Sequence, residues 1–158
     1  MDKLKSNFIL LIPIVCLISS CVSFGALPES PLDQAAAKGD LKYINDYQGD
    51  INVTDKNGMT PLMWAAQSNQ LAVVNALIEY GANVNASDKM GETALTHLCE
   101  SFYTSPEVVK VLLDAGANVN AKNSDGNTAY RIFEGLHHDS GKPEIVKVIN
   151  YLVAAGAQ

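Results

Sequence analysis

Residues 58–66 of this 158-residue chain read Gly-Met-Thr-Pro-Leu-Met-Trp-Ala-Ala, and this stretch decides the fold. The hydroxyl of Thr60 suits the N-terminal cap of a helix, and Pro61 suits the first helical position because it has no backbone N–H. Small and apolar residues follow at once. The stretch therefore predicts a buried helix that begins directly after a turn.

The markers of this stretch return at a nearly constant spacing. The glycine-x-threonine triplet at 58–60 recurs at 91–93 and 126–128, spacings of 33 and 35 residues. The segment Gly-Ala-Asn-Val-Asn-Ala likewise occurs at 81–86 and at 116–121. A period of this length indicates a repeat protein, whose units stack because one unit alone cannot bury its apolar face.

An apolar triad precedes three glycines by seven, four and three residues. That spacing places the three side chains on one face of a helix. We therefore predict that each unit has a first helix after the threonine, a short turn, and a second helix that ends at glycine. The triads are Val74, Leu77 and Ile78 before Gly81; Val109, Leu112 and Leu113 before Gly116; and Ile149, Leu152 and Val153 before Gly156.

These segments closely resemble the ankyrin repeat family, whose signature is glycine-x-threonine-proline-leucine-histidine-x-alanine-alanine. The resemblance implies an all-α repeat fold, an ankyrin-type solenoid of about four helix-turn-helix repeats with β-hairpin loops. The repeats fall at about residues 29–56, 57–89, 90–124 and 125–158. In the first of these, the spacing of apolar residues predicts a second helix that is one turn shorter.

The third and fourth repeats depart from the signature. Leu98 and Cys99 replace its two alanines in the third repeat, which makes Cys99 a predicted core residue. Two extra residues precede the second helix of that repeat, where Ser105 is the expected helix cap. The fourth repeat has a longer connection at residues 135–142.

The N-terminus has the features of a secretion signal. Lysines at 3 and 5 precede an apolar run at residues 8–18, which is too short for a membrane span of roughly 20 residues. Residues 17–21, Leu-Ile-Ser-Ser-Cys, resemble the bacterial lipobox. The resemblance implies a signal peptide at 1–20, a lipid anchor on Cys21 and a linker at 21–28.

Two alternatives remain for this segment: secretion with cleavage after Gly25, and an uncleaved membrane anchor. In the lipoprotein interpretation, Val22 rather than aspartate follows the cysteine, which implies an outer-membrane anchor that faces the periplasm. Lipidation of Cys21 also leaves Cys99 without a disulfide partner. A bridge between these two cysteines is the alternative.

The charge of the chain limits the class of partner. The formal net charge is −6 at pH 7, and cleavage before Cys21 leaves 16 acidic and 9 basic residues, a net charge of −7. Nucleic-acid binding requires clustered lysine and arginine, so the composition argues against it. It also argues against direct adhesion of the domain to anionic lipid.

Candidate catalytic or metal-binding groups are few. His97 and Cys99 are two residues apart on a predicted helix, so their side chains point away from each other. His137 and His138 are adjacent in a polar loop, where we expect them to be solvated. We therefore predict no enzyme activity, no cofactor and no metal. The alternative is an enzyme, or an enzyme accessory, with a site around His137 and His138.

We expect the chain to bind a protein partner, as a monomer, through two surfaces that the ankyrin resemblance implies. They are the hairpin tips, residues 55–59, 88–92 and 123–127, and the exposed side of the first helices. Local packing is the alternative for Met59 and Met90, as is packing between repeats for Trp64. The expected contact residues are Lys56, Asn57, Met59, Trp64, Gln67, Ser68, Lys89, Met90, Glu92, Glu100, Ser101, Ser124 and Asp125.

The function expected from these features is a membrane-tethered interaction module in the bacterial periplasm. One alternative is an accessory or immunity-type protein for an envelope enzyme or a toxin. Another is an intracellular effector, in which case the N-terminus is not a secretion signal.

Overall fold

The computed structural model describes residues 28, 30–101, 103–137 and 142–158, and in these it contains eight helices and no strand. The predicted signal peptide and Cys21 lie outside the described residues. The helices are α1 (Pro31–Lys38), α2 (Leu41–Asp46), α3 (Pro61–Gln67), α4 (Leu71–Glu79), α5 (Ala94–Cys99), α6 (Pro106–Asp114), α7 (Ala129–His137) and α8 (Pro143–Ala154).

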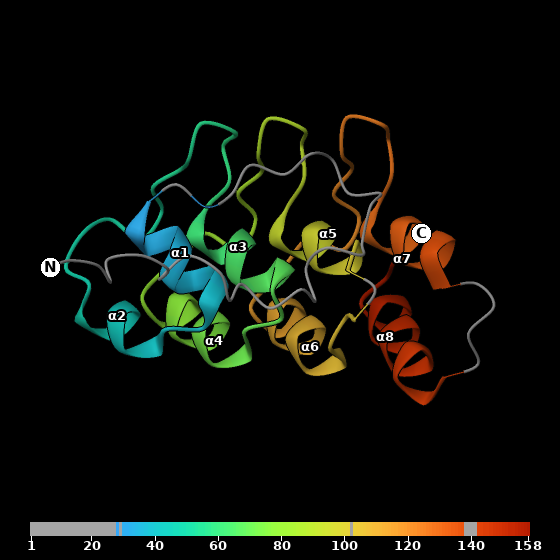
Figure 1. Cartoon of the computed structure of the whole chain (residues 1–158). Coiled ribbons are helices and arrows are strands. Elements are labelled where there is room, and N and C mark those ends of the chain that lie inside the picture. The colour runs from blue at the N-terminus through green and yellow to red at the C-terminus, as the bar shows by residue number, and fades with distance from the viewer. Residues whose placement is uncertain (1–27, 29, 102, 138–141) are drawn as a thin grey trace, which may run out of the picture.

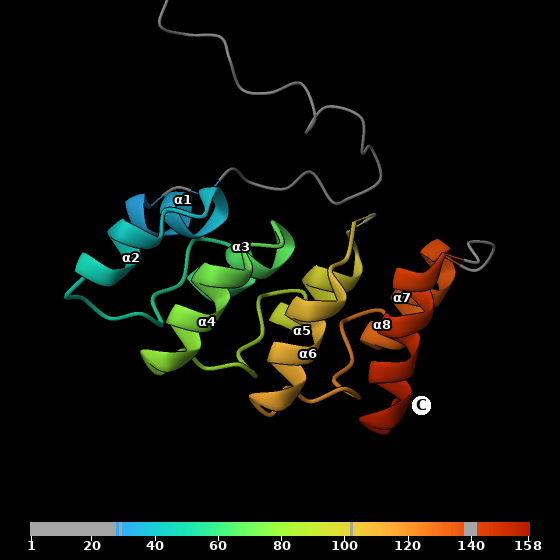
Figure 2. The ribbon, with the colours of Figure 1, turned by 90° about the horizontal axis from the view of Figure 1, so that it is seen from below.

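The helices form four antiparallel pairs that stack in one direction (Figures 1 and 2). The first helices pack on one another in the order α1, α3, α5, α7, and the second helices pack in the order α2, α4, α6, α8. Figure 1 shows the hairpin loops projecting beyond the layer of first helices. The prediction of an all-α repeat solenoid is confirmed.

Side-chain caps explain where the helices begin. The Thr60 hydroxyl accepts a hydrogen bond from the backbone N–H of Met63 at 3.3 Å, and Pro61 takes the first helical position. Ser105 caps α6 in the same way, with Pro106 after it, as the sequence predicts. At the other end of a pair, Gly81 closes α4 with a φ of 86°, a conformation that favours glycine.

The predicted β-hairpin loops are tight turns without strand pairing in the part of the chain that the structure describes. In the first loop, the Asp55 N–H donates to the Met59 carbonyl and the Gly58 N–H donates to the Asp55 carbonyl, both at 3.0 Å. The Asp55 side chain also accepts the N–H groups of Asn57 and Met59. The turn is therefore held by an aspartate rather than by a ladder of strands.

The core lies between the two helix layers. Ala65 and Ala66 are fully buried, and small side chains there let neighbouring first helices approach closely. The apolar triads are buried or half-buried, with one exception: Val153 of α8 is 54% exposed because no described helix packs on the outer face of the last repeat. Cys99 is fully buried, as predicted.

Two predictions about helix length have different outcomes. The second helix of the first repeat is short, as expected: α2 has 6 residues and α4 has 9. The connection predicted at 135–142 was placed too early, because α7 continues to His137. Burial of Phe133 and His137 on one side of α7 explains the extra turn of helix.

Asparagine side chains link each repeat to the next, and we call these links the asparagine clamps. The Asn85 amide donates to the Gly116 carbonyl at 2.9 Å and accepts the Asn118 N–H at 2.7 Å. Asn52 makes the same two contacts with Gly81 and Asn83, and Asn120 makes them with Gly156 and Gln158. Each clamp fixes the end of one second helix against the preceding repeat.

We predict that Asn85→Ala lowers the free energy of unfolding by about 1–2 kcal/mol, because it removes two hydrogen bonds between repeats. Urea unfolding followed by circular dichroism measures the change. Asn75→Ala is the matched control, since Asn75 is exposed on α4, and should change stability by at most about 0.5 kcal/mol. Equal stabilities of Asn85→Ala and the wild type would show that the clamps contribute nothing.

Candidate functional site

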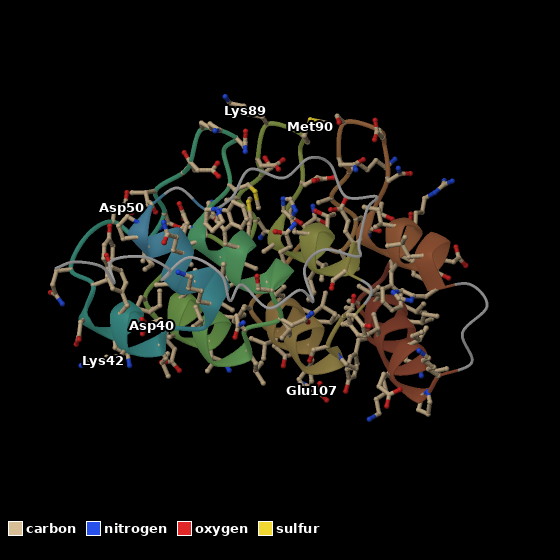
Figure 3. The ribbon with its side chains drawn as sticks, viewed as in Figure 1. Asp40, Lys42, Asp50, Lys89, Met90 and Glu107 are labelled. Carbon is tan, nitrogen blue, oxygen red and sulfur yellow. The ribbon has the colours of Figure 1, made fainter. Side chains whose placement is uncertain are left out.

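The predicted partner surface consists mainly of exposed or half-buried residues at the hairpin tips and on the first helices. Figure 3 shows Lys89 and Met90 at the tip of the second hairpin, and Met90 is 51% exposed. The exposed members of the predicted set are Lys56, Ser68, Lys89, Met90, Ser124 and Asp125. The half-buried members are Asn57, Gln67, Glu92, Glu100 and Ser101.

Two residues of the predicted set are not available as surface contacts. Met59 and Trp64 are each only 6% exposed and belong to the core. Met59 packs locally beneath its hairpin, and Trp64 fills space in the layer of first helices. Both side chains therefore pack inside the protein, which was the alternative to a partner contact, and neither is exposed enough to bind a partner.

Backbone hydrogen bonds join the hairpin tips into one continuous edge. The Lys89 N–H donates to the Asn57 carbonyl at 2.9 Å, and the Ser124 N–H donates to the Met90 carbonyl at 2.8 Å. Gly58 allows this close approach, since a Cβ there would lie 3.2 Å from the Lys89 nitrogen. The edge therefore presents side chains from three repeats at fixed positions, which suits recognition of a folded surface.

The histidine expected in a solvated loop is buried instead. His137 is 9% exposed and its ring lies against Phe133, with centroids 4.5 Å apart. His138 and Asp139 lie outside the described residues. A site around His137 and His138 would need His137 to be accessible to solvent, and His137 is buried.

A second buried histidine has a set of charged partners that the sequence did not predict. His97 Nε2 lies 3.1 Å from Asp88 Oδ2 and 3.8 Å from Glu92 Oε2, and His97 Nδ1 lies 3.8 Å from Glu100 Oε2. We call these four residues the His97 cluster. The second hairpin supplies Asp88 and Glu92, and α5 with its C-terminal cap supplies His97 and Glu100.

The electrostatics of the His97 cluster follow from burial and from its excess of acids. Burial alone would lower the pKa of His97, but the hydrogen bond to Asp88 and the neighbouring carboxylates raise it. For Asp88, the His97 contact and the N–H groups of its turn outweigh burial and lower the pKa. Burial and the nearby Glu92 carboxylate raise the pKa of Glu100 to about 7.

The sequence contained a signal for this cluster, but it required the repeat register to interpret. His97 lies four residues after the Thr93 cap, on the side of the first helix that meets its own hairpin. In the sequence, Cys99 is the reactive side chain nearest to His97, whereas Asp88 lies nine residues before it, in the hairpin. The Cys99 thiol faces the apolar core, and burial raises its pKa far above the ordinary range.

A pocket of about 540 Å³ lies between α1 and the first hairpin. Two of its lining residues, Asp33 and Asp55, each bury a carboxylate oxygen that has no hydrogen-bond partner in the part of the chain that the structure describes. The other oxygen of Asp33 accepts a hydrogen bond from the Ser30 hydroxyl at 2.7 Å. Burial is the main cause that raises the pKa of Asp33, and the charge of Asp55 adds to it.

The matches to known proteins agree with this architecture. Stacked helix pairs joined by hairpin turns define a solenoid-type repeat protein. A family model described as ankyrin repeats (3 copies) matches residues 32–123, which is more than half of the chain. The chain belongs to the ankyrin repeat family, and such repeats indicate a protein–protein interaction module.

Three relatives illustrate how the similarity is distributed. Ankyrin repeat family A protein 2 of Mus musculus is 42% identical over 74 residues, which cover 45% of this chain and 24% of that protein. Palmitoyltransferase akr1 of Schizosaccharomyces pombe is 41% identical over 56 residues, 33% of this chain and 9% of that protein. The human DNA-binding protein RFXANK is 35% identical over 69 residues, 41% of this chain and 26% of that protein.

The chain thus spans at most about a quarter of the length of these relatives. The similarity concerns a repeat segment and not whole proteins. Ankyrin repeats are typically non-enzymatic interaction domains, and only 9% of the palmitoyltransferase is covered.

We predict that Asp33→Asn makes the protein more stable at pH 7 than the wild type, and that this gain shrinks toward pH 3. The folded-state pKa of Asp33 is raised, so its contribution to stability is present below the unfolded pKa and is lost as pH rises through the folded pKa. Asparagine stays neutral and can still accept the Ser30 hydroxyl. Urea unfolding at both pH values measures the difference.

Asp46→Asn is the control, because Asp46 is an exposed carboxylate on α2 and should show a much smaller change. A gain for Asp33→Asn that is the same at pH 3 and pH 7 would contradict the assignment of the gain to a buried charge.

Proposed function

We propose that this chain is a lipid-anchored adaptor of the bacterial periplasm, which binds a protein partner through the hairpin tips and the exposed parts of the first helices. The observation that carries the proposal is the continuous edge of hairpin tips. Lys89 and Met90 lie at the second tip, Lys56 is exposed at the first, and backbone hydrogen bonds hold neighbouring tips together.

The composition of this edge suits a specific protein contact. Exposed lysines and an exposed methionine alternate with aspartates that are bound within their own turns. A methionine side chain adapts to an apolar patch on a partner, and the flanking charges set its orientation. The net charge of −6 agrees with a protein partner rather than with nucleic acid.

The anchor part of the proposal rests on the N-terminal sequence. No helix in the described part of the chain is both long enough and apolar enough to cross a membrane. A lipid on Cys21 would attach the domain through the linker that precedes α1. The repeats would then stand at the membrane surface with the hairpin edge available to a partner.

Metabolic labelling tests the anchor. We predict that the full-length chain, expressed in a bacterium that lipidates lipobox proteins, incorporates an alkyne-tagged palmitate analogue and fractionates with membranes. The variant Cys21→Ser should lose both label and membrane association, whereas Cys99→Ser should keep both. Unlabelled wild-type protein would exclude the lipid anchor and leave the binding proposal standing.

Site-specific photo-crosslinking tests the binding surface. We predict that a benzophenone side chain at Met90 gives crosslinked adducts with a discrete partner in envelope preparations. The same group at Glu107 should give none, because Glu107 is exposed on the layer of second helices, opposite the hairpin tips (Figure 3).

A charge-reversal pair complements the crosslinking. Lys89→Glu should reduce the Met90 adduct about tenfold if the lysine pairs with the partner, because a loss of about 1.4 kcal/mol corresponds to a tenfold change in affinity. Lys42→Glu, on α2, should leave the adduct unchanged. Adducts that form at Glu107 but not at Met90 would place the interface on the second helices and refute the proposal.

A further inference from the structure

We propose that Asp88, Glu92 and His97 form a binding site for one divalent transition-metal ion of the Zn²⁺ type. One donor atom from each side chain lies within 4.8 Å of the other two. A neutral imidazole nitrogen and carboxylate oxygens together form a donor set that zinc commonly takes in proteins.

The distances require only small movements to close around an ion. A tetrahedral ion with bonds of about 2.0–2.1 Å holds its donors about 3.3 Å apart. His97 Nε2 is already 3.1 Å from Asp88 Oδ2 and 3.8 Å from Glu92 Oε2. One donor atom of Glu92 lies within 4.8 Å of the other two, so a shift of the Glu92 side chain toward them completes the set.

The two carboxylates are oriented by contacts that leave one oxygen of each for the ion. Asp88 Oδ1 accepts the N–H groups of Met90 and Glu92 at 2.8 and 2.9 Å, so Oδ2 faces His97. Glu92 Oε1 accepts the side-chain amide of Asn123 at 3.2 Å, so Oε2 faces the ring. Such outer contacts are typical of metal sites, where they fix the direction of each ligand.

The second nitrogen of the buried ring, Nδ1, is placed to support an ion on Nε2. The His97 side chain is 6% exposed, and among the described residues its Nδ1 has no hydrogen-bond partner, although Glu100 Oε2 lies 3.8 Å away. With an ion on Nε2, the proton of the neutral ring resides on Nδ1 and faces Glu100. This is the arrangement of carboxylate, histidine and metal that fixes the ring tautomer in zinc proteins.

The charge balance also favours a cation. Among the described residues, the ion pairs of the cluster join three carboxylates to a single imidazole. The side chains of Asp88 and Glu92 are only 6% and 12% exposed, so water compensates their charges poorly. A divalent ion would neutralise the two that face Nε2 and would keep one open side for water.

Two of the three proposed ligands, Glu92 and His97, are not repeated in the neighbouring units. Trp64 and Ile132 occupy the position of His97 in the second and fourth repeats, at the repeat spacings of 33 and 35 residues. Met59 and Asn127 occupy the position of Glu92. Apolar side chains therefore fill the position of His97 in two other repeats, so packing alone does not require the charged set around His97.

Titration calorimetry with the full-length chain, freed of metal by a chelator, tests the proposal. We expect ZnCl₂ to bind with a stoichiometry of one per chain and to raise the Tm by several degrees, reversibly on addition of chelator. His97→Gln and Glu92→Gln should each weaken binding at least about tenfold, since each removes a ligand or its charge. MnCl₂ and CaCl₂ serve as comparison ions.

Matched controls separate the site from other donors in the chain. His137→Gln alters the other buried histidine, and Asp55→Asn alters the equivalent aspartate of the preceding hairpin; both should keep full zinc affinity. Circular dichroism verifies that each variant folds, and Glu92→Gln can keep its contact with Asn123. Zinc binding that persists unchanged in the His97→Gln and Glu92→Gln variants overturns the proposal, as does no saturable binding below about 1 mM.

Discussion

The asparagine clamps are the constraint on which the rest of the structure depends. A helix pair of this size cannot bury enough apolar surface by itself, so each pair is stable only against its neighbours. Asn52, Asn85 and Asn120 each hold the end of the next second helix through both a donor and an acceptor. With that spacing fixed, the helix layers pack in register and the hairpin tips lie close enough to share backbone hydrogen bonds.

Most of the fold could be predicted from the sequence because the repeats are governed by local rules. Threonine or serine caps, proline at the first helical position and glycine after the second helix act within a few residues, so they can be found without a structure. The exposed Val153 and the extra turn of α7 could not, because each depends on what packs beside the last repeat. Spacing in sequence shows which side chains share a face, but not whether that face has a neighbour.

At the candidate surface, the sequence position of a residue is enough to predict its exposure at some places, whereas at others the exposure depends on how deeply the side chain packs. Met90 and Lys89 extend from a hairpin tip, whereas Met59, at a tip of the same kind, is buried in the core. The His97 cluster was missed for a related reason. Its members are spread over 13 residues in two elements, and only the folded hairpin brings Asp88 Oδ2 to 3.1 Å from the imidazole.

The asparagine clamps also allow the repeats to dock one after another, beginning at the N-terminus. Each clamp side chain belongs to an earlier repeat, and the carbonyl and N–H that it holds belong to the next, as Asn85 does for Gly116 and Asn118. During synthesis the chain emerges from its N-terminus, so every new helix pair meets a neighbour whose amide is already in place. The array can therefore assemble by successive docking of helix pairs as the chain leaves the ribosome.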